Sequence, residues 1–177
     1  MEPFVEMLRG ATNSLGRTDE VTALVIADPS RAQEVYDLFL QNYEWVRLRA
    51  ASTSKRLWRH DRELFAPFVQ GWIDHVSQLD QPSAQWTFAQ MCDECDECDD
   101  ALSEGQRDRS IEIVSGYLDE ADDWIVLNSS MATLATWAKT RPELAAEITP
   151  HLERLTQDDR KSVANRATKA LGKLSLG

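Results

Sequence analysis

Three cysteines form the segment of this chain whose residue types and spacing come closest to a metal site. Cys92, Cys95 and Cys98 alternate with acidic pairs in the run Cys-Asp-Glu-Cys-Asp-Glu-Cys. On a helix, thiolates at i, i+3 and i+6 share one face and could bind one metal ion, with a carboxylate as the fourth ligand. An odd number of cysteines within seven residues is a poor disulfide framework and fits a reducing compartment.

The sequence lacks the common catalytic motifs. The chain has no Gly-x-Ser-x-Gly, no glycine-rich phosphate loop and no His-Glu-x-x-His. His60, His75 and His151 fall near expected helix ends or on charged faces, and we interpret them as surface or packing residues. We therefore expect a protein that is not an enzyme and that carries no cofactor.

The elements that position these residues follow one repeating pattern. Apolar and small residues recur at offsets 0, +4, +8 and +11, and the first positions of successive copies are 38, 42 and 37 residues apart. Helix pairs with a period of this size are typical of α-solenoids. The four copies are Val46/Ala50/Ser54/Leu57, Ala84/Phe88/Cys92/Cys95, Val126/Ser130/Leu134/Trp137 and Val163/Ala167/Leu171/Leu174.

This register also gives the cysteines an alternative interpretation. Cys92 and Cys95 fall at the +8 and +11 positions, which carry Ser, Leu or Trp in the other copies. Free cysteine behaves as a small hydrophobic residue and is often buried. We favour core cysteines without bound metal, while metal binding and redox sensing remain the alternatives.

Strand signals are almost absent, and helix-start signals such as Asp-Pro-Ser and Gln-Pro-Ser recur. The sequence therefore predicts an all-α fold. The expected helices are 2–13, 18–27, 30–41, 43–59, 61–79, 83–98, 103–119, 122–139, 141–156 and 159–175.

Two segments resemble the second helix of a HEAT repeat, whose usual form is V-R-x-x-A-x-x-A-L-G-x-L. The last copy reads Val-Ala-Asn-Arg-Ala-Thr-Lys-Ala-Leu-Gly-Lys-Leu over 163–174, and 45–51 reads Trp-Val-Arg-Leu-Arg-Ala-Ala. Only Arg47 keeps the Arg of this pattern, and the other copies have Gln85, Leu127 and Ala164 there. The resemblance covers about 150 residues, and the chain also resembles short bacterial HEAT-repeat proteins of unassigned activity.

This resemblance implies a right-handed α-solenoid of about four HEAT-like helix pairs, as one domain over 1–177. Residues 1–27 would form an N-terminal helical cap and 28–177 the repeats, because terminal repeats need a cap. It also implies a scaffold or adaptor and no reaction. The fold is shared by many unrelated binding proteins, so it indicates little about the partner.

Charge and hydropathy narrow the partner classes. The formal net charge is −11, which repels nucleic acid at long range. Charge is unevenly spread, with six bases between Arg47 and Arg62 and seven carboxylates between Asp93 and Glu104. No apolar run approaches a membrane span, and the N-terminus has no basic leader. We expect a cytoplasmic protein, without a membrane, nucleic-acid or small-molecule partner.

The register predicts where a partner would bind. Positions +2, +6, +9 and +13 point away from the core stripe and would form a concave face lined by second helices. Trp86 is the expected anchor for an extended or helical segment of another protein, although it could instead pack between repeats. The predicted partner-binding residues are Leu48, Lys55, Arg59, Trp86, Gln90, Asp93, Asn128 and Asn165.

Two other functions remain open. HEAT-like DNA glycosylases of the alkylation-repair type use aromatic residues and an Asp on a basic face, and Trp86, Asp93 and Arg59 are residues of these types. The acidic middle of the chain argues against such a groove. The other alternative is a metal-binding protein that uses the cysteine segment.

Overall fold

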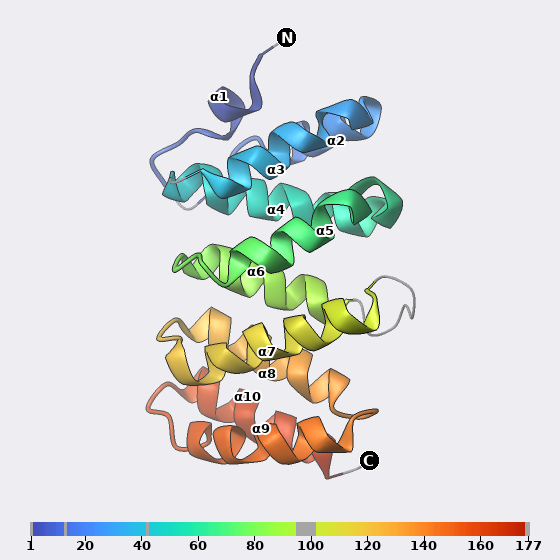
Figure 1. The fold of residues 1–177 in the computed structure, drawn as a ribbon. Helices are drawn as coiled ribbons and strands as arrows, with labels where there is room; N and C mark the ends of the chain where they lie inside the picture. Colours follow the sequence, from blue (N-terminus) through green and yellow to red (C-terminus); the bar gives the residue numbers. More distant parts are fainter. Residues whose placement is uncertain (1, 13, 42, 95–101, 176–177) are drawn as a thin grey trace. The chain divides into compact units, whose positions relative to one another are not determined.

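The structure is a computed structural model that describes residues 2–12, 14–41, 43–94 and 102–175. Over these residues it contains α-helices and one short 3-10 helix, and no strand occurs among them. The all-α prediction is confirmed, and Figure 1 shows the order of the helices along the chain.

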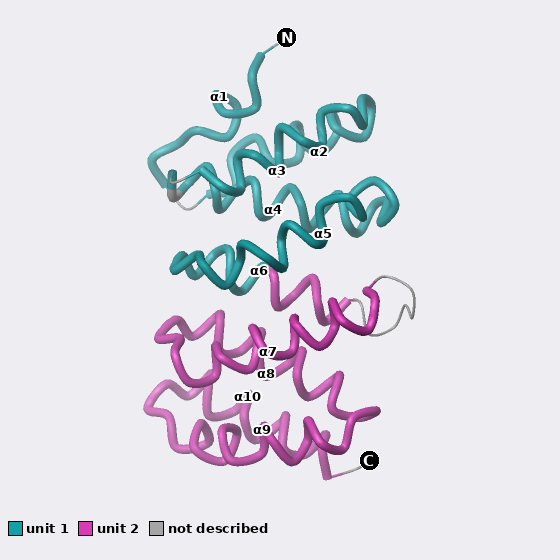
Figure 2. The backbone as a smooth tube through the Cα atoms, in the orientation of Figure 1, with its two compact units in different colours: residues 1–87 teal, residues 88–177 magenta. Residues whose placement is uncertain are grey.

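The chain divides into two compact units, which Figure 2 shows in teal and magenta. Unit 1 comprises residues 1–87 and unit 2 comprises residues 88–177. The boundary lies within one helix, α6 (Pro82–Asp93). The expectation of one domain over 1–177 stays a prediction.

Unit 1 is built around one long helix. This central helix, α4, packs against α1, α2, α3 and α5. Aromatic rings fill the space between α3 and α5, where Phe39 stacks on Trp72 with ring centroids 3.8 Å apart. The helices of unit 1 that precede α6 are α1 (Phe4–Leu8), α2 (Thr18–Ala27), the 3-10 helix η1 (Pro29–Arg31), α3 (Ala32–Leu40), α4 (Glu44–His60) and α5 (Arg62–Val76).

The N-terminal helix is shorter than the expected 2–13. The backbone leaves the helix after α1 because a buried guanidinium from α4 binds the carbonyl groups that follow. Arg49 donates to the carbonyl oxygens of Leu8, Thr12 and Ser14 at 2.7, 2.8 and 2.8 Å. The loop after α1 therefore obtains from Arg49 the hydrogen bonds that a longer helix would have formed internally.

Unit 2 contains two helix hairpins after α6. They consist of α7 (Glu104–Glu120) with α8 (Trp124–Trp137), and α9 (Pro142–Leu155) with α10 (Lys161–Leu174). The two hairpins stack, because α7 contacts α9 and α8 contacts α10. Helix α7 begins with a capping box formed by Ser103 and Gln106. Unit 2 thus has one layer of α7 and α9 and a second layer of α8 and α10.

The predicted core stripe is buried where the structure describes it. The four first positions, Val46, Ala84, Val126 and Val163, are each at most 4% exposed. The later positions of the stripe are buried as well, except Leu171 and Leu174 at the end of α10, which are partly exposed. Cys95 lies outside the described residues. The helical register deduced from the sequence is therefore correct for the core.

Candidate functional site

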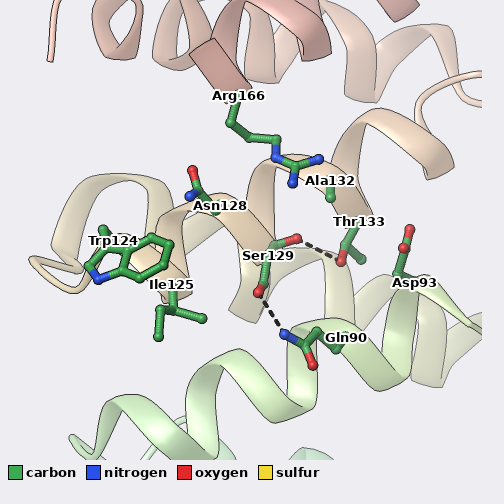
Figure 3. Close-up of a pocket in the computed structure, with 9 residues that line it drawn as sticks. All are labelled: Gln90, Asp93, Trp124, Ile125, Asn128, Ser129, Ala132, Thr133 and Arg166. Atoms are coloured by element: carbon green, nitrogen blue, oxygen red, sulfur yellow. Dashed lines mark hydrogen bonds between the residues drawn. The ribbon is translucent and has the colours of Figure 1, made fainter. Parts of the chain in front are cut away.

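A pocket of about 360 Å³ opens in unit 2 between α6, α8 and α10. Helix α8 forms its floor, the last turns of α6 form one wall, and a single arginine reaches over it from α10 (Figure 3). The residues that line it are Gln90, Asp93, Trp124, Ile125, Asn128, Ser129, Ala132, Thr133 and Arg166. Apolar contact area, amides and both signs of charge therefore meet in one cavity.

The apolar end of the pocket is set by the first turn of α8. Asp123 caps this helix, because its carboxylate accepts hydrogen bonds from the backbone N–H groups of Ile125 and Val126 at 2.8 and 3.1 Å. The cap places Trp124 at the first helical position, where its side chain stays 50% exposed. A half-exposed indole beside Ile125 is an anchor surface of the kind enriched at protein interfaces.

The middle of the pocket is polar and ties α6 to α8. Gln90 donates from its side-chain amide to the Ser129 hydroxyl at 3.2 Å, as Figure 3 shows. The Thr133 hydroxyl donates to the carbonyl oxygen of Ala89 at 2.7 Å. These two bonds hold the end of α6 against α8. They also engage both hydroxyl groups of the pocket in helix-to-helix contacts.

The remaining polar groups of the pocket are without partners among the described residues. The Oδ1 atoms of Asp93 and Asn128 are shielded from solvent and accept no hydrogen bond there. Arg166 is exposed and forms no ion pair within the described part of the chain. The side chains of the pocket that a ligand can reach directly are the exposed ones, Trp124 and Arg166.

The structure brings three of the predicted partner-binding residues together in this pocket. Gln90 and Asp93 reach it from α6 and Asn128 from α8. Asn165 is exposed on α10 beside Arg166, but it does not line the pocket. In unit 2, three of the four predicted partner-binding residues thus line one cavity.

The four predicted residues of unit 1 have different surroundings. Lys55 lies over the ring of Trp86, with its Nζ atom 5.3 Å from the ring centroid. Trp86 itself is partly buried, and Arg59 is exposed. Leu48 is a correction, because it was expected to point outward and is only 8% exposed.

The burial of Leu48 follows from the position of α2. Leu48, Ser52 and Arg56 succeed one another at intervals of four residues and so share one face of α4. Arg56 pairs with Asp19 of α2 at 2.8 Å, which shows that α2 crosses this face. The sequence register treated α4 as a helix with one covered side, whereas α4 is covered on several.

Sequence reasoning missed Trp124, Ile125 and Arg166. A signal for Trp124 was present, because it precedes Val126 by two residues and so lies about 200° around the helix from the core stripe. Arg166 carried no such signal. It follows Val163 by three residues, which places it on the flank of the core stripe, and only the packing of α10 on α8 brings it over the pocket.

The basic run of α4 is largely structural. Arg47 and Arg49 are 5% and 2% exposed. Arg47 donates to the carbonyl oxygen of Phe39 at 3.1 Å and to the side chain of Gln81 at 3.0 Å, and burial lowers its pKa. Guanidinium groups enclosed in this way cannot contact a phosphate backbone, which weakens the DNA-binding alternative.

The cysteine segment is described only in part. Cys92 is 3% exposed, which confirms the core interpretation for this residue, and Cys95 and Cys98 lie outside the described residues. Burial, with the nearby Cys92 as a smaller contribution, raises the pKa of Tyr117. Within the described ranges, no group of three His, Cys, Asp or Glu side chains is placed to bind a metal ion.

A comparison with models of known protein families and with curated proteins gave no match for this chain. Over the residues that the structure describes, no helix is both long enough and apolar enough to cross a membrane.

Proposed function

We propose that this protein is a non-catalytic interaction module that binds a short segment of another protein in the pocket of unit 2. The observation that carries the proposal is the convergence of Gln90, Asp93 and Asn128 on one cavity beside the exposed Trp124. An aromatic anchor next to polar groups that fix orientation is the usual composition of a peptide-binding site.

The size of the pocket fits a short extended segment. The floor of the pocket runs along α8 from Trp124 to Ala132, eight residues or about 12 Å of helix. An extended chain covers that length with about four residues. An apolar side chain of the partner would pack on Trp124, and side-chain amides such as that of Asn128 can pair with the peptide backbone.

The chemistry of the pocket supports binding more than catalysis. Its two hydroxyl groups, on Ser129 and Thr133, take part in hydrogen bonds between helices. No histidine is among the lining residues that the structure describes. A hydroxyl nucleophile needs a neighbouring base to be reactive, and no base among the described side chains is paired with these groups.

We further propose that the helix pairs are HEAT-like repeats of a right-handed solenoid. Two features support this arrangement: the core stripe is buried in the same register in α4, α6, α8 and α10, and the two hairpins of unit 2 stack pair on pair. Such stacks bind partners along an extended surface more often than in a deep cavity. An adaptor role therefore agrees with the proposed fold.

Peptide selection tests the proposed function directly. A random peptide library displayed on phage would be selected on the immobilised full chain, and in parallel on Trp124→Ala and Tyr43→Ala. Tyr43 is a matched control because it is also a well-exposed aromatic residue, at 59%, and it lies in unit 1. We expect peptides enriched by the parent to be kept by Tyr43→Ala and lost by Trp124→Ala.

Two outcomes would contradict the proposal: no peptide family is enriched, or the enriched peptides bind Trp124→Ala as well as the parent. Circular dichroism would show that each variant is folded. The same selection on Trp86→Ala examines the anchor predicted from the sequence, whose ring face Lys55 partly covers. Loss of binding in that variant alone would assign the partner site to unit 1.

A further inference from the structure

The two helix layers of unit 2 differ in charge. The layer of α7 and α9 contains eight Asp and Glu residues, five in α7 and three in α9, whereas the layer of α8 and α10 contains none. Helix α8 has no charged residue at all, and α10 has four Lys and Arg residues. Unit 2 as a whole is acidic, with eighteen Asp and Glu residues against ten Lys and Arg, so its basic layer is an exception.

Three of the cations of α10 form a basic strip along one side of the helix. Arg166, Lys169 and Lys173 succeed one another at intervals of three and four residues, which places them within about 60° of one another around the helix axis. All three are exposed. The basic strip extends over about 10 Å of helix.

The basic strip has no counter-charge from the part of the chain that the structure describes. None of its three side chains forms an ion pair there. Other arginines of unit 2 are paired, because Arg141 contacts Asp108 at 2.6 Å and Arg154 contacts Asp119 at 3.0 Å. Like charges three and four residues apart on a helix repel one another, so carboxylates from outside unit 2 would relieve that repulsion.

The basic strip begins at the pocket. Arg166 reaches over the pocket from α10, and Trp124 lies in the same pocket with half of its side chain exposed (Figure 3). Asp93, the one carboxylate among the lining residues described, lies at the end of the pocket away from Trp124. A segment that is anchored on Trp124 can therefore contact Arg166 and continue along α10.

From these features we infer that the partner segment is acidic: next to the apolar residue that packs on Trp124, it carries two or three Asp or Glu residues that pair with the basic strip. This inference rests on the proposed function and specifies the chemistry of its partner. About three or four residues of extended chain cover the length of the strip. Exposed ion pairs are individually weak, so Trp124 supplies the anchor and the strip selects the partner.

A short protein segment fits this surface better than a nucleic acid or an anionic membrane does. A long polyanion is repelled by the net charge of −11, whereas a short segment interacts mainly with groups within the screening length of about 10 Å. The apolar residues of α10 are not available to lipid, because Val163, Ala167 and Ala170 are at most 3% exposed.

The test uses the peptides enriched in the phage selection, resynthesised with blocked termini and a fluorescent label. We expect acidic residues beside an apolar one in these peptides. Each peptide is compared with a version in which every Asp and Glu is replaced by Asn and Gln. Fluorescence anisotropy with the full chain should show at least about tenfold weaker binding of the amide version, because several ion pairs are lost together. The difference should shrink as the salt concentration rises.

Variants of the chain locate the effect. A triple variant with Arg166→Gln, Lys169→Gln and Lys173→Gln should bind the acidic peptides at least about tenfold more weakly, and it should no longer distinguish them from their amide versions. Lys161→Gln is the matched control, because it removes an exposed cation of the same helix that lies about 140° around the axis from Arg166. This control should bind as the parent does, and circular dichroism would show that both variants are folded.

Failure of this inference can be distinguished from failure of the proposed function. If the peptides need Trp124 but bind the triple variant as well as the parent, the pocket binds a segment and the acidic assignment is wrong. If a labelled DNA duplex or vesicles with anionic lipid bind the parent more tightly than the peptides do, and the triple variant loses that binding, the strip recognises phosphate groups, which also overturns the inference. If no peptide depends on Trp124, the proposed function itself fails, and the inference fails with it.

Discussion

The polar side chains of the two units differ in their hydrogen bonding. In unit 1, Arg49 gives three hydrogen bonds to backbone carbonyls, and Arg56 pairs with Asp19. In unit 2, the polar atoms of Asp93 and Asn128 that line the pocket have no partner within the described residues. Side chains that bind their own backbone maintain the fold, whereas exposed side chains of the pocket such as Trp124 and Arg166 remain accessible to a ligand. The comparison teaches that a charged run in a sequence is not by itself a binding surface.

The largest difference in stability is expected between alanine substitutions of one tryptophan in each unit. Trp72 in unit 1 is 1% exposed and stacks on Phe39, so Trp72→Ala should lower the free energy of unfolding by about 4 kcal/mol. Trp124 in unit 2 is 50% exposed, and Trp124→Ala should lower it by only about 0.5 kcal/mol. Urea denaturation followed by circular dichroism measures both. Similar losses in the two variants would show that Trp124 is a packing residue.

The second-largest loss of stability is expected when Arg49, the buried arginine of unit 1, is replaced. Arg49→Met leaves the carbonyl oxygens of Leu8, Thr12 and Ser14 without their donor, so unfolding should become easier by about 3 kcal/mol. Arg166→Met, the same change at the pocket of unit 2, should alter stability by less than about 0.5 kcal/mol. Equilibrium unfolding in urea tests both variants. A tolerant Arg49→Met protein would contradict a structural role for this arginine.

Alanine substitutions at two glycines, one in each unit, are expected to change stability by smaller amounts and in opposite directions. A Cβ at Gly10 would lie 2.6 Å from the guanidinium nitrogens of Arg49, which the loop holds in place, so Gly10→Ala should destabilise by about 1 to 2 kcal/mol. At Gly116, within α7, a Cβ would meet no atom within 4 Å. Gly116→Ala should therefore stabilise by about 0.5 to 1 kcal/mol, because alanine favours the helix. Melting temperatures that shift in the same direction would refute this pair of expectations.

The smallest effect is a pH dependence in unit 2. The hydrogen bonds that Arg160 donates lower the pKa of Asp158 to about 2, below its usual value of 3.8. The lower folded-state pKa means that the stabilisation is complete above about pH 4 and is lost as the pH falls towards 2. Asp158→Asn should therefore be less stable than the parent at pH 6, with a difference that shrinks at pH 2. Thermal unfolding across this range measures it, and a difference independent of pH would exclude the ion pair as its source.

Much of the local structure was accessible from sequence. The repeat identified the core residues of four helices, because burial of one face imposes a helical period on apolar positions. The start signals Asp-Pro-Ser and Gln-Pro-Ser marked the beginnings of α3 and α6 within two residues. The main error in helix length was in the N-terminal helix, where a distant residue, Arg49, supplies the hydrogen bonds that end it. The helix propensity of residues 2–13 gives no information about such a contact.

The candidate site was accessible only in part. Its α6 residues and Asn128 were predicted as outward positions of the repeat, since an outward direction depends on the helix alone. Leu48 was also predicted as outward and is buried, because a second helix covers that side. The sequence by itself thus determined which residues form helices and which face of each helix enters the core, both consequences of period and capping. Only the tertiary structure decided that Asp93, Trp124 and Arg166 meet around one cavity, because their proximity depends on how α6, α8 and α10 pack.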